Sequence, residues 1–65
     1  MKQETVNRIE RLELVIKDHE DSIQWYKGMT CESDFEAHIN ALNIHEEKLA
    51  IRAIRREIKA MSVSA

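Results

Sequence analysis

The sequence predicts an all-α protein in which two antiparallel helices form one hairpin, and two hairpins pair into a four-helix bundle. Three observations lead to this prediction. The chain has 65 residues with no proline and a single glycine, Gly28, so helix-breaking residues are confined to one point. Apolar residues recur every three or four positions, as they do on one face of a helix. A capping sequence soon after Gly28 marks a helix start.

The first helix is predicted over residues 4–27. Its apolar positions advance in alternating steps of three and four residues, which is a heptad seam with His19 as the one polar member. The seam consists of Ile9, Leu12, Ile16, His19, Ile23 and Tyr26. Gly28 follows at a position where a residue in the left-handed conformation often ends a helix. Lys27 places a positive charge at the negative end of the helix dipole.

A short turn over residues 28–32 is predicted to lead into a second helix over residues 33–61. Ser33 and Glu36 have the spacing of a capping box. The Ser33 hydroxyl would accept from the Glu36 amide, and the Glu36 carboxylate would return to the Ser33 amide. Thr30 is an alternative cap, and the tail after the helix is expected to fray. Because the turn is so short, the helices must be antiparallel neighbours.

The apolar residues of the second helix change sides along its length. At about 100° per residue, two stripes lie roughly 140° apart around the helix. The first stripe contains Phe35, Ile39, Leu42, Leu49 and Ala53. The second stripe contains Ile51, Ile54, Ile58 and Met61. One straight partner helix cannot cover both stripes.

This surplus of apolar surface predicts a homodimer. A core of this size rarely supplies more than about 3–5 kcal/mol, so small folds usually need a further source of stability. The predicted self-association residues are Leu14, Ile51, Ile54, Ile58 and Met61. The alternative is that Leu14 and Trp25, which lie opposite the first seam, are scattered surface residues of an ordinary kind.

Two surface features are candidates for contact with a partner. The first is a basic stripe on the second helix, made of Lys48, Arg52, Arg55, Arg56 and Lys59. It is either an anion-binding face or a solvated face that suits a helix C-terminus. The second is Trp25 near the turn, since tryptophan often dominates binding interfaces. Nearby glutamates and the lack of interleaved aromatic residues favour an unknown protein partner. A nucleic-acid-binding regulator is the alternative.

The residues that commonly carry chemistry are too scattered to predict a metal site, a cofactor or an enzyme. His38 and His45 would lie about 10 Å apart along the helix axis, too far for one ion to bridge. Cys31 is the only cysteine, so no internal disulfide forms. No nucleophile is paired with a base, and there is no glycine-rich phosphate loop. His19 is a candidate pH-sensitive position, whose protonation would weaken assembly near or below about pH 6.5.

Composition predicts one small cytoplasmic domain. The net charge of −2 excludes a polycation, so any nucleic-acid contact must come from a local patch. No apolar stretch approaches the roughly 20 residues needed to cross a membrane. The first residues lack the apolar run of a secretion signal. A lone cysteine fits a reducing compartment.

Four segments of the chain resemble a family of phage proteins. The segments are RIERLELVIKDHE, IQWYKG, DFEAHINAL and HEEKLAIRAIRREIKAM. They are similar to the small accessory proteins encoded between the exonuclease and excisionase genes of lambda-like temperate phages. The resemblance covers most of the chain. It implies an early phage protein, dispensable for growth, that modulates the host cell or the choice between lysis and lysogeny through contacts. It transfers no binding residues.

Overall fold

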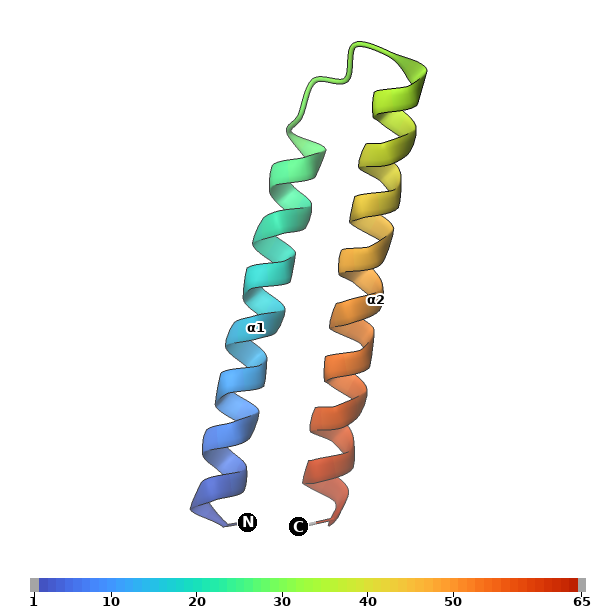
Figure 1. Cartoon of the computed structure of the whole chain (residues 1–65). Helices are drawn as coiled ribbons and strands as arrows, with labels where there is room; N and C mark the ends of the chain where they lie inside the picture. The colour runs from blue at the N-terminus through green and yellow to red at the C-terminus, as the bar shows by residue number, and fades with distance from the viewer. Residues whose placement is uncertain (1, 65) are drawn as a thin grey trace.

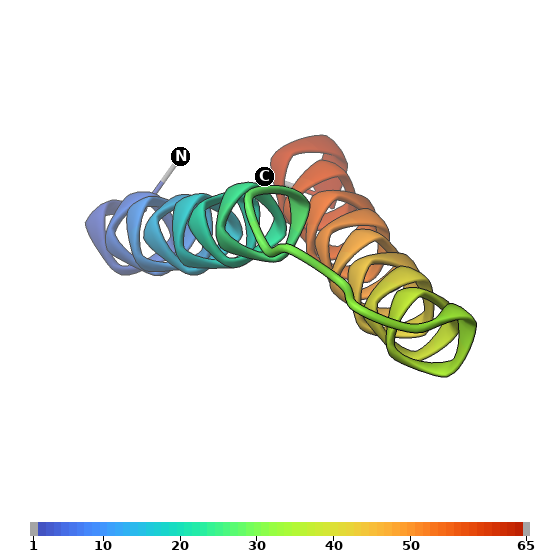
Figure 2. The same cartoon turned by 90° about the horizontal axis from the view of Figure 1, so that it is seen from above.

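Residues 2–64, which a computed structural model describes, form two helices. Helix α1 spans Gln3–Lys27 and helix α2 spans Asp34–Ser64. The helices run antiparallel, so the start of α1 and the end of α2 lie at one end of the hairpin and the turn lies at the other (Figure 1). Seen from the turn end, the helices are inclined to each other (Figure 2). The predicted all-α hairpin is confirmed.

The predicted seam of α1 faces α2. Ile16 and Ile23 are buried, and the other seam members are half-buried. The facing row of α2 also advances in steps of three and four residues. This inner row consists of Asn40, Ile44, Glu47, Ile51, Ile54, Ile58 and Met61. Ile51 completes the core with Ile16 and Ile23, and Ile44, Ile54 and Ile58 pack around them.

The structure corrects the prediction of which α2 stripe is left for a second copy. The sequence analysis assigned Ile51, Ile54 and Ile58 to self-association, but in the hairpin these side chains pack against α1. Met61 lies half-buried on the same row. Helix α1 instead leaves uncovered the stripe that contains Phe35, Ile39, Leu42 and Leu49. Both stripes have helical periodicity, and the inner row is covered because the turn places it opposite the apolar seam of α1.

Gly28 ends α1 without a left-handed conformation, contrary to the prediction. Its φ of −80° and ψ of −9° are right-handed, so the helical turn simply continues through it. The Gly28 amide donates to the Gln24 carbonyl at 3.0 Å, and the Met29 amide donates to the Tyr26 carbonyl at 3.2 Å. The chain then leaves the helix over the residues that follow.

The predicted cap of α2 forms, with one change of partner. The Glu36 amide donates to the Ser33 hydroxyl at 3.1 Å, as expected for a capping box. The Glu36 carboxylate accepts from the Glu32 amide at 2.9 Å, one residue before the predicted partner. Helix α2 continues past its predicted end at Met61 to Ser64, and Ala65 of the predicted tail lies outside the described residues. No glycine or proline interrupts it there.

Within residues 2–64, neither helix contains an apolar segment of the length that a membrane span requires. The Cα atoms extend over 50 × 15 × 9 Å. Both helices are therefore exposed to solvent along most of their circumference, and the function of the chain has to be sought on these outer faces.

Candidate interaction surfaces

Helix α2 presents a second apolar row on the side that points away from α1. Its large members are Phe35, Ile39, Leu42 and Leu49, which are 73%, 40%, 46% and 45% exposed. We call these four residues the outward stripe. Their spacing of four, three and seven residues keeps them on one side of the helix. Helix α2 is therefore apolar on two sides, and α1 covers one of them.

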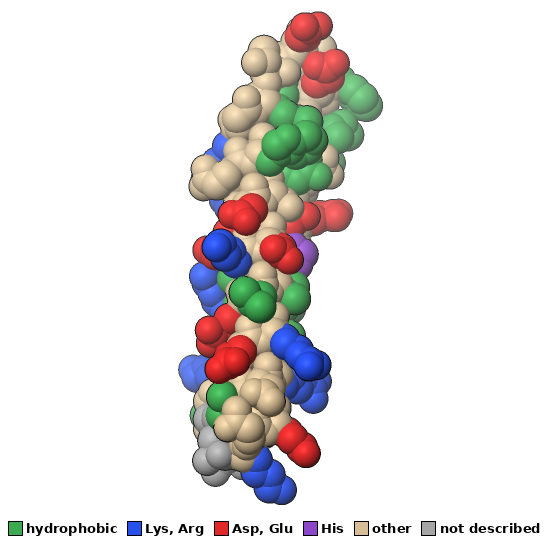
Figure 3. Space-filling view, turned by 90° about the vertical axis from the view of Figure 1, so that its left-hand side faces the viewer, with side chains coloured by type: hydrophobic (Ala, Val, Ile, Leu, Met, Phe, Trp, Pro, Cys, Tyr) green, Lys and Arg blue, Asp and Glu red, His purple; other side chains and the backbone are tan. Residues whose placement is uncertain are grey.

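The outward stripe continues into a hollow at the turn end of the hairpin. The hollow has a volume of about 320 Å³ and shares Phe35 and Ile39 with the stripe. Met29 and Cys31 of the turn contribute to its lining. Apolar side chains gather at this end of the molecule in the space-filling view (Figure 3). The stripe and the hollow together form one apolar surface that begins at the turn.

Asn40 connects the turn end to the inner row. Its side-chain amide donates to the Tyr26 carbonyl at 2.9 Å, which links α2 to the last turn of α1. The Asn40 Oδ1 atom is buried and has no hydrogen-bond partner within the described residues. This hydrogen bond fixes the helix register next to the hollow.

Helix α1 has three exposed large apolar residues, Leu14, Val15 and Trp25, and the first and last of them lie opposite its seam, away from the outward stripe. Trp25 is 63% exposed and contacts Tyr26 edge-on, with ring centroids 5.2 Å apart. Leu14 is 64% exposed. Leu14 and Trp25 are eleven positions apart along α1, so they do not form a continuous apolar row. The predicted contact role of Trp25 and the predicted self-association role of Leu14 both stay predictions.

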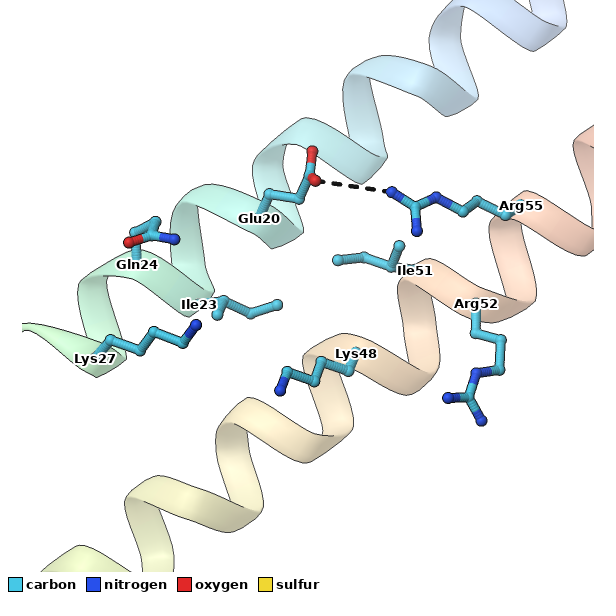
Figure 4. A pocket seen from close by; sticks show the side chains of 8 residues that line it. All are labelled: Glu20, Ile23, Gln24, Lys27, Lys48, Ile51, Arg52 and Arg55. Atoms are coloured by element: carbon cyan, nitrogen blue, oxygen red, sulfur yellow. Dashed lines mark ion pairs between the residues drawn. The ribbon is translucent and has the colours of Figure 1, made fainter.

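A basic groove of about 420 Å³ runs between the helices on one side of the hairpin. Ile23 and Ile51 line its base, and Glu20 is its one acidic residue (Figure 4). The cations around it are Lys27, Lys48, Arg52 and Arg55. Arg55 lies 3.8 Å from the Glu20 carboxylate, but both side chains are more than half exposed, so this ion pair is weak. Within residues 2–64, the other three cations have no ion pair.

The groove divides the basic stripe that the sequence predicted. Three of its five residues line the groove, whereas Arg56 and Lys59 do not. Lys27 of α1 joins the groove, and the sequence analysis considered it only as a C-terminal charge. Lys27 and Lys48 become neighbours only through the antiparallel pairing of the helices. The heptad position of Lys27, beside the seam, was the one signal in the sequence that pointed to it.

His19, the candidate pH-sensitive position, has a polar partner on the other helix. Its Nδ1 atom contacts the Glu47 carboxylate on the inner row of α2, and both side chains are half-buried. This contact joins the middle of the two helices across their interface. A second cross-helix pair joins Arg8 and Glu57 at 2.9 Å near the chain ends.

The remaining histidines and the cysteine stay apart. His38 and His45 are exposed on α2, and Cys31 is half-buried in the turn. Among the described residues, no three histidine, cysteine, aspartate or glutamate side chains lie close enough together to hold a metal ion.

Comparison with protein-family models, with curated proteins and with solved structures found no match to this chain. The outward stripe and the basic groove are therefore the features that point to a function.

Proposed function

We propose that this chain is a small interaction protein and that the outward stripe of α2 is its docking surface for another protein chain. It has no catalytic role in this proposal. In keeping with the resemblance, it serves as an early accessory factor of a temperate phage and modulates the host or phage development through protein contacts. The observation that carries the proposal is that α2 is apolar on two sides and α1 covers only one.

The physical basis of docking is the removal of the outward stripe from water. Burial of apolar surface is worth about 25 cal/mol per Å², so four large exposed side chains are a substantial driving force. A row with helical spacing matches a partner helix, whose own side chains fit between successive turns. Glu46 lies between Leu42 and Leu49 on this side of α2 and adds a polar contact that limits the choice of partner.

Site-specific cross-linking tests the docking role. A photo-reactive amino acid replaces Leu49 in the chain expressed in bacterial cells, and the control variant carries it in place of Glu10 on the outer side of α1. We expect protein adducts from position 49, to a second copy or to a host protein, and few from position 10. The further substitution Leu42→Ser should remove the adducts, because it breaks the stripe about two helical turns away from position 49. Equal adducts from both positions would contradict the proposal.

The second candidate function is nucleic-acid binding, and one observation favours it. Lys27 of α1 joins three cations of α2 around the basic groove, so the positive charge is more concentrated than the sequence alone indicated. A nucleic-acid contact of this kind weakens steeply with salt because counterions are released. We expect any retention on DNA at about 50 mM salt to fall sharply by about 200 mM. Lys48→Glu should reduce it, and an absence of retention at the lower salt excludes this candidate.

A further inference from the structure

We infer that the occupant of the outward stripe is a second copy of this chain, whose α2 lies antiparallel to the first α2. The inference rests on the docking role proposed for the stripe and names its partner. The twofold axis passes near residue 51 of each α2. The two α1 helices then lie on the outside of a four-helix assembly, each still packed on its own α2.

The charges of α2 favour the antiparallel orientation. The first half of the helix, residues 34–47, contains four acidic residues and no lysine or arginine. The second half, residues 48–64, contains five lysine and arginine residues and one acidic residue, Glu57. Antiparallel pairing places the acidic half of each helix beside the basic half of the other, whereas parallel pairing places like charges together. The helix dipoles also oppose each other favourably in the antiparallel arrangement.

The outward side of α2 also determines a register. Continued along the helix in steps of three and four, the row through the outward stripe passes Glu46, Ala53, Arg56, Ala60 and Val63. Glu46 and Arg56 are its two charged members. Both side chains are exposed, and neither has an ion pair within the described residues. One antiparallel register places Glu46 opposite Arg56 of the second copy, and the twofold symmetry forms this pair twice.

The same register matches large side chains with smaller ones. Leu49 then lies opposite Ala53 of the second copy, and Leu42 lies opposite Ala60. Ile39 lies opposite Val63. Alternation of large and small residues lets two helices approach closely without voids. It also overlaps the two α2 helices along nearly their whole length, since the helix runs from Asp34 to Ser64 and the axis lies close to its midpoint.

The surface of a single hairpin leaves room for such an interface. The hairpin exposes 5292 Å² of solvent-accessible surface. A compact protein of 7.6 kDa exposes about 4,300 Å², so the hairpin has an excess of about 1,000 Å². A standard protein interface buries about 800 Å² on each partner. The excess is therefore of the size that one stable dimer interface removes.

Charge exchange at residues 46 and 56 tests the register. Sedimentation equilibrium measures the dimer dissociation constant of the wild type, of Glu46→Arg, of Arg56→Glu and of the double variant. Each single substitution places like charges opposite each other twice, so we expect it to weaken dimerisation by about tenfold or more. The double substitution restores the opposite charges and should return the dissociation constant to within about threefold of the wild-type value. Glu10→Arg makes a matched charge change on the outer side of α1 and should leave dimerisation nearly unchanged.

An equimolar mixture of the two single variants provides a second test of the register. In the mixed dimer both charge pairs are attractive again, so the mixture should associate more tightly than either variant alone. A wild-type chain that is monomeric at every concentration overturns the inference, as does a dimer that neither single substitution weakens. The register is also overturned if neither the double variant nor the mixture regains a dissociation constant close to that of the wild type. A monomer that still forms adducts with host proteins from position 49 overturns only this inference and leaves the proposed docking function standing.

Discussion

Three polar side chains occupy seam positions where a helical hairpin usually has apolar ones. His19 on α1 faces Glu47 on α2, and Asn40 donates to the Tyr26 carbonyl at the turn end. A polar group in a seam costs stability unless its partner is aligned with it, so each contact penalises any sliding of one helix along the other. These residues set the register of the hairpin, while the isoleucines of the core provide its cohesion.

The His19–Glu47 pair should contribute more to register than to stability. We expect the double substitution His19→Leu with Glu47→Leu to raise the free energy of unfolding by about 1 kcal/mol or more, because apolar residues pack without a desolvation cost. Each single substitution should leave the chain less stable than the double variant, since it strands one polar partner in the interface. Urea unfolding measures the difference, and Glu10→Leu on the outer side is the control. A double variant that is less stable than the wild type would show that the pair is a net source of stability.

Gly28 is expected to accept a side chain. An added Cβ atom would lie 3.6 Å from the Gln24 and Trp25 carbonyl oxygens, which is ordinary contact, and the φ of −80° suits any L-residue. Gly28→Ala should therefore raise the free energy of unfolding by about 0.4–1 kcal/mol through the unfolded chain. Urea unfolding is again the measurement. A loss of stability of about 1 kcal/mol would instead indicate a left-handed conformation at this position.

Helix α2 has two apolar sides with different tasks. Ile51 on the inner row is 6% exposed and belongs to the core, whereas Leu49, two positions earlier, is 45% exposed on the outward stripe. Ile51 therefore contributes to folding, and Leu49 is free to contribute to the proposed association. An exposed basic groove lies beside the inner row, so the same helix also carries most of the concentrated positive charge.

Matched truncations should separate these two tasks. Ile51→Ala removes a buried side chain and should lower the free energy of unfolding by about 2–4 kcal/mol. Leu49→Ala should cost well under half of that in the isolated hairpin, but it should weaken self-association in sedimentation equilibrium. Chemical unfolding at low protein concentration measures the free energy of unfolding of the single hairpin without a contribution from association. Equal losses of stability for the two variants would mean that Leu49 is already covered within one chain.

The whole molecule is long and thin for its size. Its Cα radius of gyration is 15.3 Å, whereas a compact domain of 65 residues has one of about 11 Å. Only Ile16, Ile23 and Ile51 fall in the buried class among the described hydrophobic residues, and no described side chain is fully buried. A single hairpin of this shape has little apolar burial to offset its conformational entropy. Association is the available route to greater stability.

The melting temperature should consequently depend on protein concentration. Binding that involves only the folded state stabilises it by mass action, so Tm should rise steadily over a hundredfold increase in concentration. Calorimetry or circular dichroism across that range provides the measurement. Glu46→Arg, which is expected to weaken the dimer, should show a smaller rise. A wild-type Tm that is independent of concentration would contradict a folded state that is stabilised by dimerisation.

The order and bounds of the helices were readable from the sequence because local chemistry sets them. The seam of α1 is a repeat within one segment, and the Ser33 cap of α2 joins residues three positions apart. A lone glycine in a chain without proline left one place for a turn. The ends were less accurate, since the last residues of α2 continue the helix and Gly28 keeps a right-handed conformation.

The periodicity of the sequence did not determine which side of α2 packs against α1. The stripes through Ile51 and through Leu42 both have helical spacing, so spacing alone could not tell that α1 covers the stripe through Ile51. The choice is made when the turn closes and the inner row comes opposite Ile16 and Ile23, with Glu47 opposite His19. The basic groove has the same origin, because Lys27 and Lys48 approach each other only across the hairpin. The spacing of apolar residues predicts which sides of a helix are apolar. Contacts between residues that are distant in the sequence decide which of those sides is buried.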